Sequence, residues 1–268
     1  MIHSHTYKTK PIIWQYWETR NLKPYFIDGL FKLAKQNSGI EVIRVTPETL
    51  HHFLPDIPDD ILRINVLAHK ADMIRAMLVC KYGGMWLDSD AIVLKDLHCF
   101  FDYLLEYDFI GFNYSGRLTP CIKVCCFLAR PECPIMKEWV QAQHSKLPRR
   151  KFKWSEIGRA LLGPICVTHG SSIKVLPFNL VCPIPSKRSR RLYKRTLDAD
   201  DIINSAFVVM MHNSGIKKRH PEILKMTIED IAADNYLLSK ILRFAISRRK
   251  HGKHIPENTN MTQPQNIY

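Results

Sequence analysis

The 268-residue chain has no long apolar segment, no paired cysteine motif and few acidic residues. No apolar run approaches the roughly 18 residues expected of a membrane-spanning helix. Residues 1–8 also lack the apolar core of a signal peptide. We therefore expect a cytoplasmic protein that is made and kept in a reducing environment, with peripheral attachment to a membrane as the one membrane role left open.

The eight cysteines give no clear sign of disulfides or of zinc. A chain of this length needs no disulfide to stabilise its core. Four cysteines lie close in sequence: Cys121, Cys125, Cys126 and Cys133. Their spacing lacks the paired C-x-x-C of common zinc sites, and residues 122–128 have the apolar character of a buried strand. A zinc site is the weaker alternative here.

Acidic residues are scarce, with 25 Asp and Glu against 39 Lys and Arg, for a net charge of +14. Such an excess indicates an anionic partner, such as a membrane surface, nucleic acid or a phosphorylated substrate. The basic residues cluster at 146–153, 187–195, 217–219 and 243–254. Each cluster alone is better explained as a solvated loop or helix face. The densest, 187–195, is predicted to be an exposed loop, with a mobile lid as one role. No nucleic-acid recognition motif is present, so we expect no nucleic-acid partner.

The rest of the chain is organised around an acidic turn. A Gly83-Gly84 pair ends one element, a short apolar run follows, and then come Asp88, Ser89 and Asp90 before a second apolar run. The pattern predicts a helix, a glycine stop, a strand, an acidic turn and another strand. Strand alternation would direct Asp88 and Asp90 to the same side. Two such carboxylates repel each other unless a hard cation such as Mg²⁺ or Mn²⁺ lies between them. The alternative is a polar turn without function.

The segment before this turn, residues 65–82, is predicted to be a helix with one apolar face. His69, Asp72 and Arg75 recur every three residues on a neighbouring face, so they stack along the helix. An exposed Asp72–Arg75 ion pair, worth little energetically, is the structural alternative. The position of these polar residues directly before the acidic turn favours a shared site.

The N-terminal third alternates strands and helices, with strands at 11–17 and 40–45 and a helix capped by Asn21 between them. This order predicts a mostly parallel sheet with helices on its faces. Ligands of such sheets bind beyond the carboxyl ends of the strands, where Trp17 and the acidic turn both fall. Trp17 is then either a platform for a nucleobase or a core aromatic. We expect one domain over residues 1–255 and a flexible tail at 256–268.

The C-terminal half adds a helix at 154–162, stopped by Gly163-Pro164, and a buried strand at 206–211. This strand delivers His212 at its end, where it is either a metal ligand or a structural residue. A final helix is predicted at 229–247. Its apolar stripe packs on the domain, and its basic end either faces water or rests on an anionic membrane.

Ala71-Asp72-Met73-Ile74-Arg75, followed by the segment 82–90, resembles the core signature of glycosyltransferase family 32. That family includes bacterial capsular-polysaccharide synthesis proteins and is similar to the glucosyltransferase domains of large clostridial toxins. The resemblance covers about residues 11–97. It implies an α/β fold of the GT-A type, with a mostly parallel central sheet flanked by helices. It also implies metal-dependent, retaining transfer from a nucleotide-sugar donor, a UDP-sugar, to a glycan or lipid-linked acceptor of surface polysaccharide synthesis.

The resemblance also implies roles for individual residues. Asp90 would contact Mn²⁺ or Mg²⁺ directly, and Asp88 would reach the ribose or a metal-bound water. Asp72 and Arg75 would hold sugar hydroxyls or a phosphate oxygen. His212 would be a third metal ligand, although the tryptophan that often follows the family's C-terminal histidine is missing here.

In the family, a His-Gln-x-Trp stretch ends the first strand. Here it is Trp14-Gln15-Tyr16-Trp17, which implies that Gln15 and Trp17 contact the nucleotide and leaves the role of Trp14 open. Trp86 matches an aromatic residue that flanks the acidic pair in the toxins.

Two other functions are compatible with parts of the pattern. Phosphatases of the haloacid dehalogenase type also place Asp-x-Asp after an apolar strand, but near the N-terminus, whereas here the motif begins at Asp88. A basic nucleic-acid-binding module would account for the charge. It predicts binding to DNA that falls steeply with salt.

Overall fold

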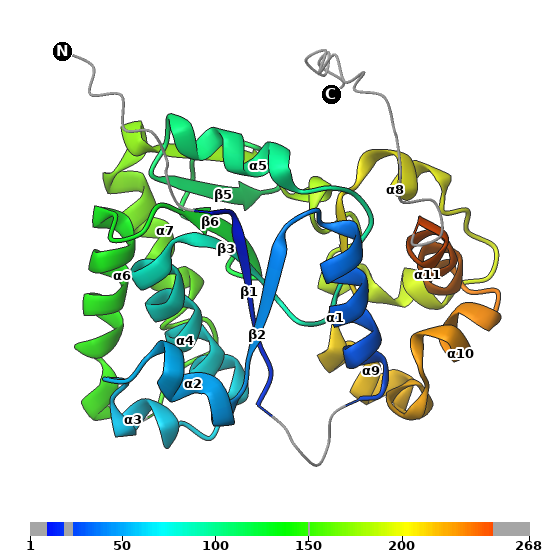
Figure 1. Ribbon diagram of the computed structural model, residues 1–268, viewed down its shortest axis with the longest axis horizontal. Coiled ribbons are helices and arrows are strands. Elements are labelled where there is room, and N and C mark those ends of the chain that lie inside the picture. The colour runs from blue at the N-terminus through cyan, green and yellow to red at the C-terminus, as the bar shows by residue number, and fades with distance from the viewer. Residues whose placement is uncertain (1–9, 19–23, 150, 249–268) are drawn as a thin grey trace.

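The computed structural model describes residues 10–18, 24–149 and 151–248, and these form two β-sheets covered by helices (Figure 1). The larger sheet has the order β2-β1-β3-β6-β5-β7 and the smaller one pairs β4 with β8. In the larger sheet only β6 runs against its neighbours. The strands are β1 (Ile12–Tyr16), β2 (Glu41–Val45), β3 (Gly84–Leu87), β4 (Ala91–Val93), β5 (Phe109–Asn113), β6 (Cys126–Ala129), β7 (Ile173–Pro177) and β8 (Val208–Met210). The expected mostly parallel α/β architecture is confirmed.

Helices cover the sheets in two groups, which Figure 1 shows to either side of β1 and β2. One group packs with the six-stranded sheet: α2 (Pro47–Phe53), α3 (Asp59–Leu62), α4 (Leu67–Tyr82), α5 (His98–Asp102), α6 (Pro134–His144) and α7 (Arg159–Thr168). The other surrounds the β4–β8 pair: α1 (Phe26–Asn37), α8 (Asp200–Ser205), α9 (Asn213–Arg219), α10 (Ile228–Ala233) and α11 (Leu237–Arg248). We call these two regions the sheet lobe and the helical lobe.

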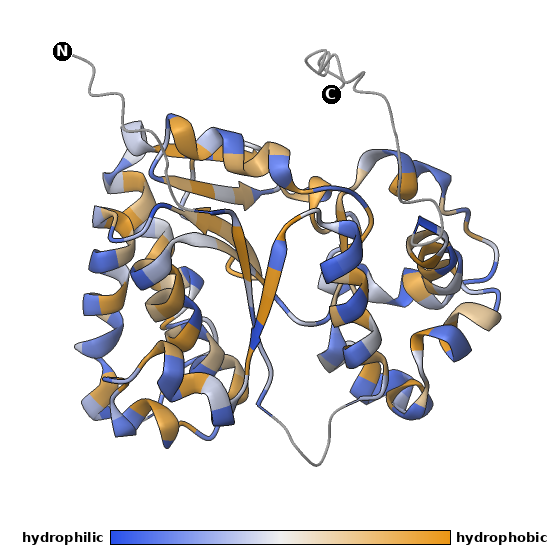
Figure 2. Cartoon of the chain, in the orientation of Figure 1, coloured by the Kyte–Doolittle hydropathy of each residue, from blue (hydrophilic) through white to orange (hydrophobic). Residues whose placement is uncertain are grey.

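Apolar residues line the strands, and on the helices they alternate with hydrophilic ones (Figure 2). In the sheet lobe, one buried cluster joins α4, α6 and α7 to Trp14 and Trp86. In the helical lobe, another joins α1, α10 and α11 to Ile92 and Val209. Burial of such surface is the main driving force for folding, so each lobe has its own apolar core around the strands it covers.

The glycine pair before β3 is required by the backbone. Gly83 and Gly84 both have positive φ, at 67° and 95°, a region that side chains disfavour. A Cβ at Gly84 would also lie 2.6 Å from the Ile12 carbonyl oxygen of β1. The helix, glycine stop and strand predicted here are confirmed. The next strand, β4, leaves the large sheet and pairs antiparallel with β8, so the acidic turn crosses from one sheet to the other.

Several sequence predictions were wrong in detail. The helix expected to stop at Gly163-Pro164 instead begins at Arg159 and continues to Thr168 with Pro164 inside it. Pro164 removes one backbone hydrogen bond, but Leu162 and Cys166 on either side of it are fully buried. Packing therefore outweighs the local cost of the proline.

The long C-terminal helix is two helices, α10 and α11, separated by an extended Asp234. The Arg243 guanidinium donates from Nη1 to the carbonyls of Ala232 and Asp234, at 2.5 and 2.6 Å, which satisfies the end of α10. The basic stretch 187–195 is also not a loop: Ser186–Tyr193 forms a 3₁₀-helix with Ser189 and Leu192 buried.

No helix in the described ranges is long and apolar enough to cross a membrane. The proposed cap Asn21 and the tail 256–268 lie outside the described residues. The single-domain assignment for residues 1–255 stays a prediction.

Candidate active site

The acidic turn lies beyond the carboxyl ends of β1 and β3. The Asp88 backbone N–H donates to the Cys125 carbonyl at 3.0 Å, and the Ala91 N–H closes the turn on the Asp88 carbonyl at 3.2 Å. The Ser89 hydroxyl, which is buried, donates to the Tyr16 carbonyl at 3.0 Å. Because two neighbouring segments hold the turn and a hydrogen bond of its own closes it, its two carboxylates are fixed at the junction of the two sheets.

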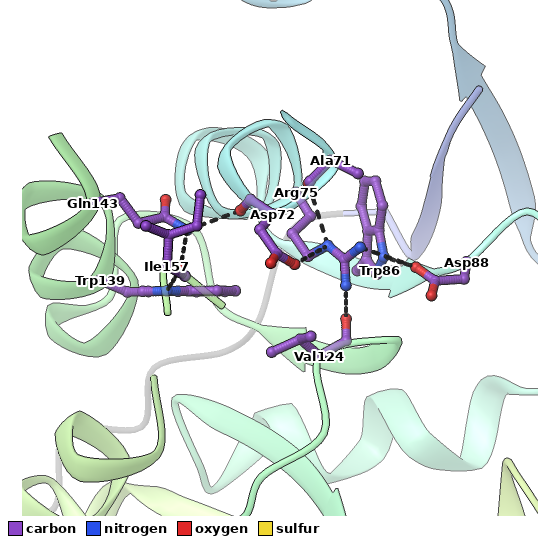
Figure 3. Close-up of polar contacts among 9 residues, drawn as sticks. All are labelled: Ala71, Asp72, Arg75, Trp86, Asp88, Val124, Trp139, Gln143 and Ile157. Atoms are coloured by element: carbon purple, nitrogen blue, oxygen red, sulfur yellow. Dashed lines mark hydrogen bonds and ion pairs between the residues drawn. The ribbon is translucent and has the colours of Figure 1, made fainter. Parts of the chain in front are cut away.

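On the side of the sheet lobe, Arg75 links two carboxylates (Figure 3). Its Nη2 lies 3.3 Å from Oδ1 of Asp88, and its Nε lies 3.5 Å from Oδ1 of Asp72. Its Nη1 donates to the Val124 carbonyl at 2.6 Å. Trp86 also donates from Nε1 to Oδ1 of Asp88 at 2.8 Å, and the guanidinium lies 4.9 Å from the Trp86 ring centroid. The polar row on α4 thus reaches the acidic turn, and the ion pair of Asp72 with Arg75 is buried.

A second layer behind Asp72 was not found from the sequence. Gln143 of α6 donates from Nε2 to the carbonyls of Asp72 and Ile157, at 2.9 and 2.8 Å. Trp139 donates from Nε1 to the same Ile157 carbonyl at 3.1 Å. At Gly158, an added Cβ would lie 2.5 Å from Oδ2 of Asp72. No local pattern identifies Gln143 or Gly158, because both meet α4 only after the chain has folded.

The surroundings of the carboxylates favour a positive charge at the turn. Burial raises the pKa of Asp88 to about 6; Arg75 opposes this shift, and repulsion from Asp90 adds to it. Burial likewise raises the pKa of Asp72 above its usual range, again opposed by Arg75. The single guanidinium does not fully compensate for the carboxylates around it.

On the side of the helical lobe, a backbone amide holds Asp90. The Asn213 N–H donates to Oδ2 of Asp90 at 2.8 Å, and the Met211 N–H donates to its carbonyl at 2.9 Å. Between them, His212 has a left-handed backbone conformation with φ 58° and begins α9. Its Nε2 lies 2.7 Å from the Ile184 carbonyl. When Nε2 donates this hydrogen bond, Nδ1 carries the lone pair, which is the arrangement found in metal-binding histidines.

The chemistry of these donors fits a hard divalent cation. The contacts above occupy Oδ1 of Asp88 and Oδ2 of Asp90, and each carboxylate has a second oxygen. Mg²⁺ and Mn²⁺ commonly take one or two carboxylates and complete their shell with water and substrate phosphates. Within the described ranges, no set of three or more His, Cys, Asp and Glu side chains converges closely enough to hold a metal by itself. A substrate phosphate is therefore needed to complete such a site.

Three residues predicted to contact the nucleotide differ in their burial: Trp86, Gln15 and Trp17. Trp86 is fully buried, so it offers no face to a nucleotide and instead orients Asp88. Gln15 is also fully buried, and neither its Oε1 nor its Nε2 has a partner among the described residues. Trp17 is partly buried against the core of the helical lobe, and its Nε1 has no partner there either.

A polar link from β1 to α4 is a further feature that sequence reasoning missed. Lys70 donates from Nζ to Glu18, whose other carboxylate oxygen accepts from the Tyr16 hydroxyl at 3.0 Å. Glu18 and Lys70 are 52 residues apart in the sequence. No local pattern indicated that they would meet. The link fixes the end of β1 against the helix that carries the polar row.

The topology and the placement of the acidic turn define an α/β fold of the GT-A type. A solved glycosyltransferase involved in glycosylation of the PBCV-1 major capsid superposes with a TM-score of 0.50, covering 81% of this chain and 100% of that one at 14% identity. The glycosyltransferase PaToxG superposes with a TM-score of 0.47, covering 90% and 87% at 10% identity.

The family model described as capsular polysaccharide synthesis protein matches residues 2–143, which is more than half of the chain. The chain belongs to this family, and the relationship predicted from segments 71–75 and 82–90 is confirmed. O-glycosyltransferase PaGT of Phomopsis amygdali is 27% identical over 124 residues. That alignment covers 39% of this chain and 30% of the relative, so the chain spans only part of that protein's length.

Proposed function

We propose that the protein is a metal-dependent, retaining glycosyltransferase that moves a sugar from a nucleotide-sugar donor to a glycan or lipid-linked acceptor. The observation that carries this proposal is the pair Asp88 and Asp90 at the junction of the two sheets, with Arg75 within 3.3 Å of Asp88. Family membership and the name of the PaGT relative support it. Retention of configuration rests on the resemblance to glycosyltransferase family 32.

The leaving group in this reaction is a nucleoside diphosphate, on which negative charge grows as the glycosidic bond breaks. A Mn²⁺ or Mg²⁺ ion would be held by Asp88 and Asp90, with substrate phosphates completing its shell, and would neutralise that charge as a Lewis acid. His212 would become a further ligand only by moving closer, since no three such side chains converge among the described residues. Arg75 is positioned to donate to a phosphate oxygen or a sugar hydroxyl. Asp72 is held beside it by Gln143 and accepts hydrogen bonds from sugar hydroxyls.

The nucleotide would lie on the helical-lobe side of the turn. There Trp17 offers an aromatic ring for stacking on the base, and stacking of this kind tolerates any base. The UDP assignment rests on the family resemblance. Gln15 has two unpartnered amide atoms, and a buried polar group without partners is costly. Gln15 is also fully buried, so its role as a nucleotide contact rests on the family resemblance alone.

An anionic partner is supported by a positive surface beside the site. The basic end of the C-terminal helix stays a prediction, because residues 249–254 lie outside the described ranges. Two basic residues of α11 are engaged within the protein: Arg243 at the end of α10, and Arg248, which donates to the Leu94 carbonyl at 2.8 Å. The 3₁₀-helix at 186–193 and α9 lie together, since Arg219 donates to the Ser189 hydroxyl at 3.0 Å. Their exposed Lys and Arg side chains form the surface we propose for an anionic membrane or a phosphate-linked acceptor.

The decisive experiment is a thermal-shift screen of nucleotide sugars, each with and without Mn²⁺, followed by turnover of the best donor. We expect one UDP-sugar to raise the melting temperature only when Mn²⁺ is present. Stabilisation by no nucleotide sugar, together with salt-sensitive DNA binding, would favour the nucleic-acid alternative. Pelleting with anionic but not neutral vesicles at low salt tests the membrane partner separately.

A further inference from the structure

The polar row on α4 continues past the proposed donor site toward one exposed segment. His69, Asp72 and Arg75 are 5%, 7% and 6% exposed. The His69 ring centroid lies 5.7 Å from that of Phe152 and 6.3 Å from that of Trp154. Gly158 of the same segment packs on the Asp72 carboxylate. Residues 151–158 therefore cover the far end of the row.

This segment is held firmly against α4 and α6. Gln143 and Trp139 both donate to the Ile157 carbonyl, and Gln143 also holds Asp72, as Figure 3 shows. At the other end, Glu156 accepts from the Lys153 N–H at 2.8 Å and from Arg149 Nη1 at 2.6 Å. These contacts set where the side chains between them lie.

Trp154 lies between these anchors and is 78% exposed, the highest value among the large apolar residues of the described chain. The other four tryptophans are buried or partly buried. A single exposed apolar residue is not by itself a binding site; what distinguishes Trp154 is that its ring lies against His69 of the polar row. Its ring face is electron-rich and attracts the partly positive C–H groups of a flat apolar ligand.

The position of Trp154 along the row indicates which part of the substrate it would meet. Arg75 contacts Asp88, so the sugar next to the diphosphate belongs at Arg75 and Asp72. His69 lies six residues before Arg75, about 9 Å along the helix axis. Counted from Asp72, which also belongs to the donor sugar, the distance is about 4.5 Å, close to the length of one pyranose ring. His69 is itself buried, with no partner for its Nε2 among the described residues, so its ring packs beside Trp154 rather than meeting the ligand directly.

We propose that Trp154 is the sugar-stacking platform of the acceptor subsite, where the C–H face of the acceptor's terminal pyranose lies on the indole. The acceptor is therefore a glycan end, and its hydroxyls face the His69 end of the polar row. This inference rests on the proposed glycosyltransferase function, and it adds a residue outside the segment matched by the family model.

The first test compares transfer to water with transfer to sugar, using the donor selected by the thermal-shift screen and methyl pyranosides of gluco, galacto and manno configuration as acceptors. Trp154→Ala should reduce the acceptor-dependent rate roughly tenfold, as for loss of one aromatic stacking contact. Its donor hydrolysis and Mn²⁺ dependence should stay at the wild-type level. Trp154→Phe, which keeps a flat ring, should retain most of the acceptor-dependent rate.

Leu105→Ala is the matched control. Leu105 is 56% exposed and precedes β5, at the edge of the sheet opposite the acidic turn. This variant should behave as wild type. An unchanged acceptor-dependent rate in Trp154→Ala would overturn the proposal. An equal loss of donor hydrolysis, with an unchanged melting temperature, would overturn it too, because Trp154 would then bind the donor.

A second test needs no turnover and separates this proposal from the proposed function. Because Trp154 is the most exposed of the five tryptophans, iodide quenching of the fluorescence should act mainly on it and should largely disappear in Trp154→Phe. The methyl pyranosides should protect the wild-type protein from quenching. Protection without turnover of any nucleotide sugar would remove the proposed function but keep a sugar subsite. Turnover without protection would remove the subsite.

Discussion

The two sides of the acidic turn are built differently. On the sheet-lobe side, side chains hold the carboxylate: Arg75 and Trp86 both contact Oδ1 of Asp88. On the helical-lobe side, the backbone N–H of Asn213 holds Asp90. Contacts between side chains depend on residue identity, whereas a backbone contact depends only on conformation. The family match ends at residue 143 and so includes the first side but not Asn213.

This difference predicts separate roles for the two sides. The buried pair Asp72 and Arg75 and the half-buried Asp88 are held together before any ligand arrives, as an electrostatic site for a developing charge needs to be. The second side is assembled from segments that are far apart in the chain. They place Trp17 after β1, Asp90 before β4 and His212 after β8. Substitutions on the first side should therefore affect turnover, and those on the second side should affect binding of metal and nucleotide. Asp90 is the exception, because it is held from the helical-lobe side but would carry the metal together with Asp88.

The largest effect is expected from Asp90→Asn. The amide keeps an oxygen that can accept from the Asn213 N–H, so the fold should be retained while the anionic oxygen is lost. We expect donor turnover to fall on the order of 10²–10³-fold, as for loss of one electrostatic contact to the leaving group. Turnover and melting temperature are measured together across a Mn²⁺ titration. Near-normal turnover at limiting Mn²⁺ would remove Asp90 from the metal site.

Gly158→Ala tests whether the sheet-lobe side needs its precise geometry. The new methyl would lie 2.5 Å from Oδ2 of Asp72, so the carboxylate has to move. A displacement of about 1 Å can reduce turnover about 10²-fold. Gly170→Ala, whose nearest contact is 3.1 Å from the flexible end of Leu118, is the control. Steady-state kinetics should show a lower kcat for the first variant only. Equal kinetics would mean that Asp72 tolerates movement.

Trp17→Ala tests the nucleotide role of the helical lobe. Loss of a stacked base should weaken binding of UDP by roughly 1–3 kcal/mol, whichever sugar is attached. Isothermal calorimetry with UDP alone measures this, and Trp17→Phe should restore most of the affinity. If Trp17→Ala is unfolded, Trp17 belongs to the core, with which it is already in contact.

His212→Ala should raise the Mn²⁺ concentration for half-maximal activity by about tenfold, as for loss of one contributor to a metal site. The loss of the Ile184 contact should leave the backbone bond from Asn213 to Asp90 in place. His98→Ala serves as the control, because His98 is exposed and paired with Asp96. An unchanged Mn²⁺ requirement in a stable His212→Ala protein would assign His212 a structural role.

The smallest effect is a pH dependence of metal binding from Asp88. Its pKa of about 6 lies above the ordinary value of 3.8, so protons compete with the cation as the pH falls. From about pH 7 to about pH 6 the ionised fraction falls from roughly 90% to half, which weakens Mn²⁺ binding about twofold. From about pH 6 to about pH 5 the loss should be about fivefold more. Mn²⁺ titration without donor measures this, and Asp88→Asn should remove the dependence. Constant affinity down to about pH 5 would place the pKa of Asp88 well below 6.

The sequence by itself determined the elements that depend on local rules. The glycine pair before β3 needs a positive φ, and the α4 row follows from a spacing of three residues. Asp88 and Asp90 follow the short apolar strand that the sequence predicted. Local conformation and periodicity are enough for these features, and they carried the family assignment as well.

Only the tertiary structure decided which of these elements meet. The proline inside α7 and the break between α10 and α11 depend on packing against other parts of the chain. Gln143, Gly158 and Asn213 reach the site from positions far along the sequence. The same holds for the exposure of Trp154, since a tryptophan is placed in water or in the core by the surfaces around it. Contacts of this kind follow from chain topology, which local propensity does not encode.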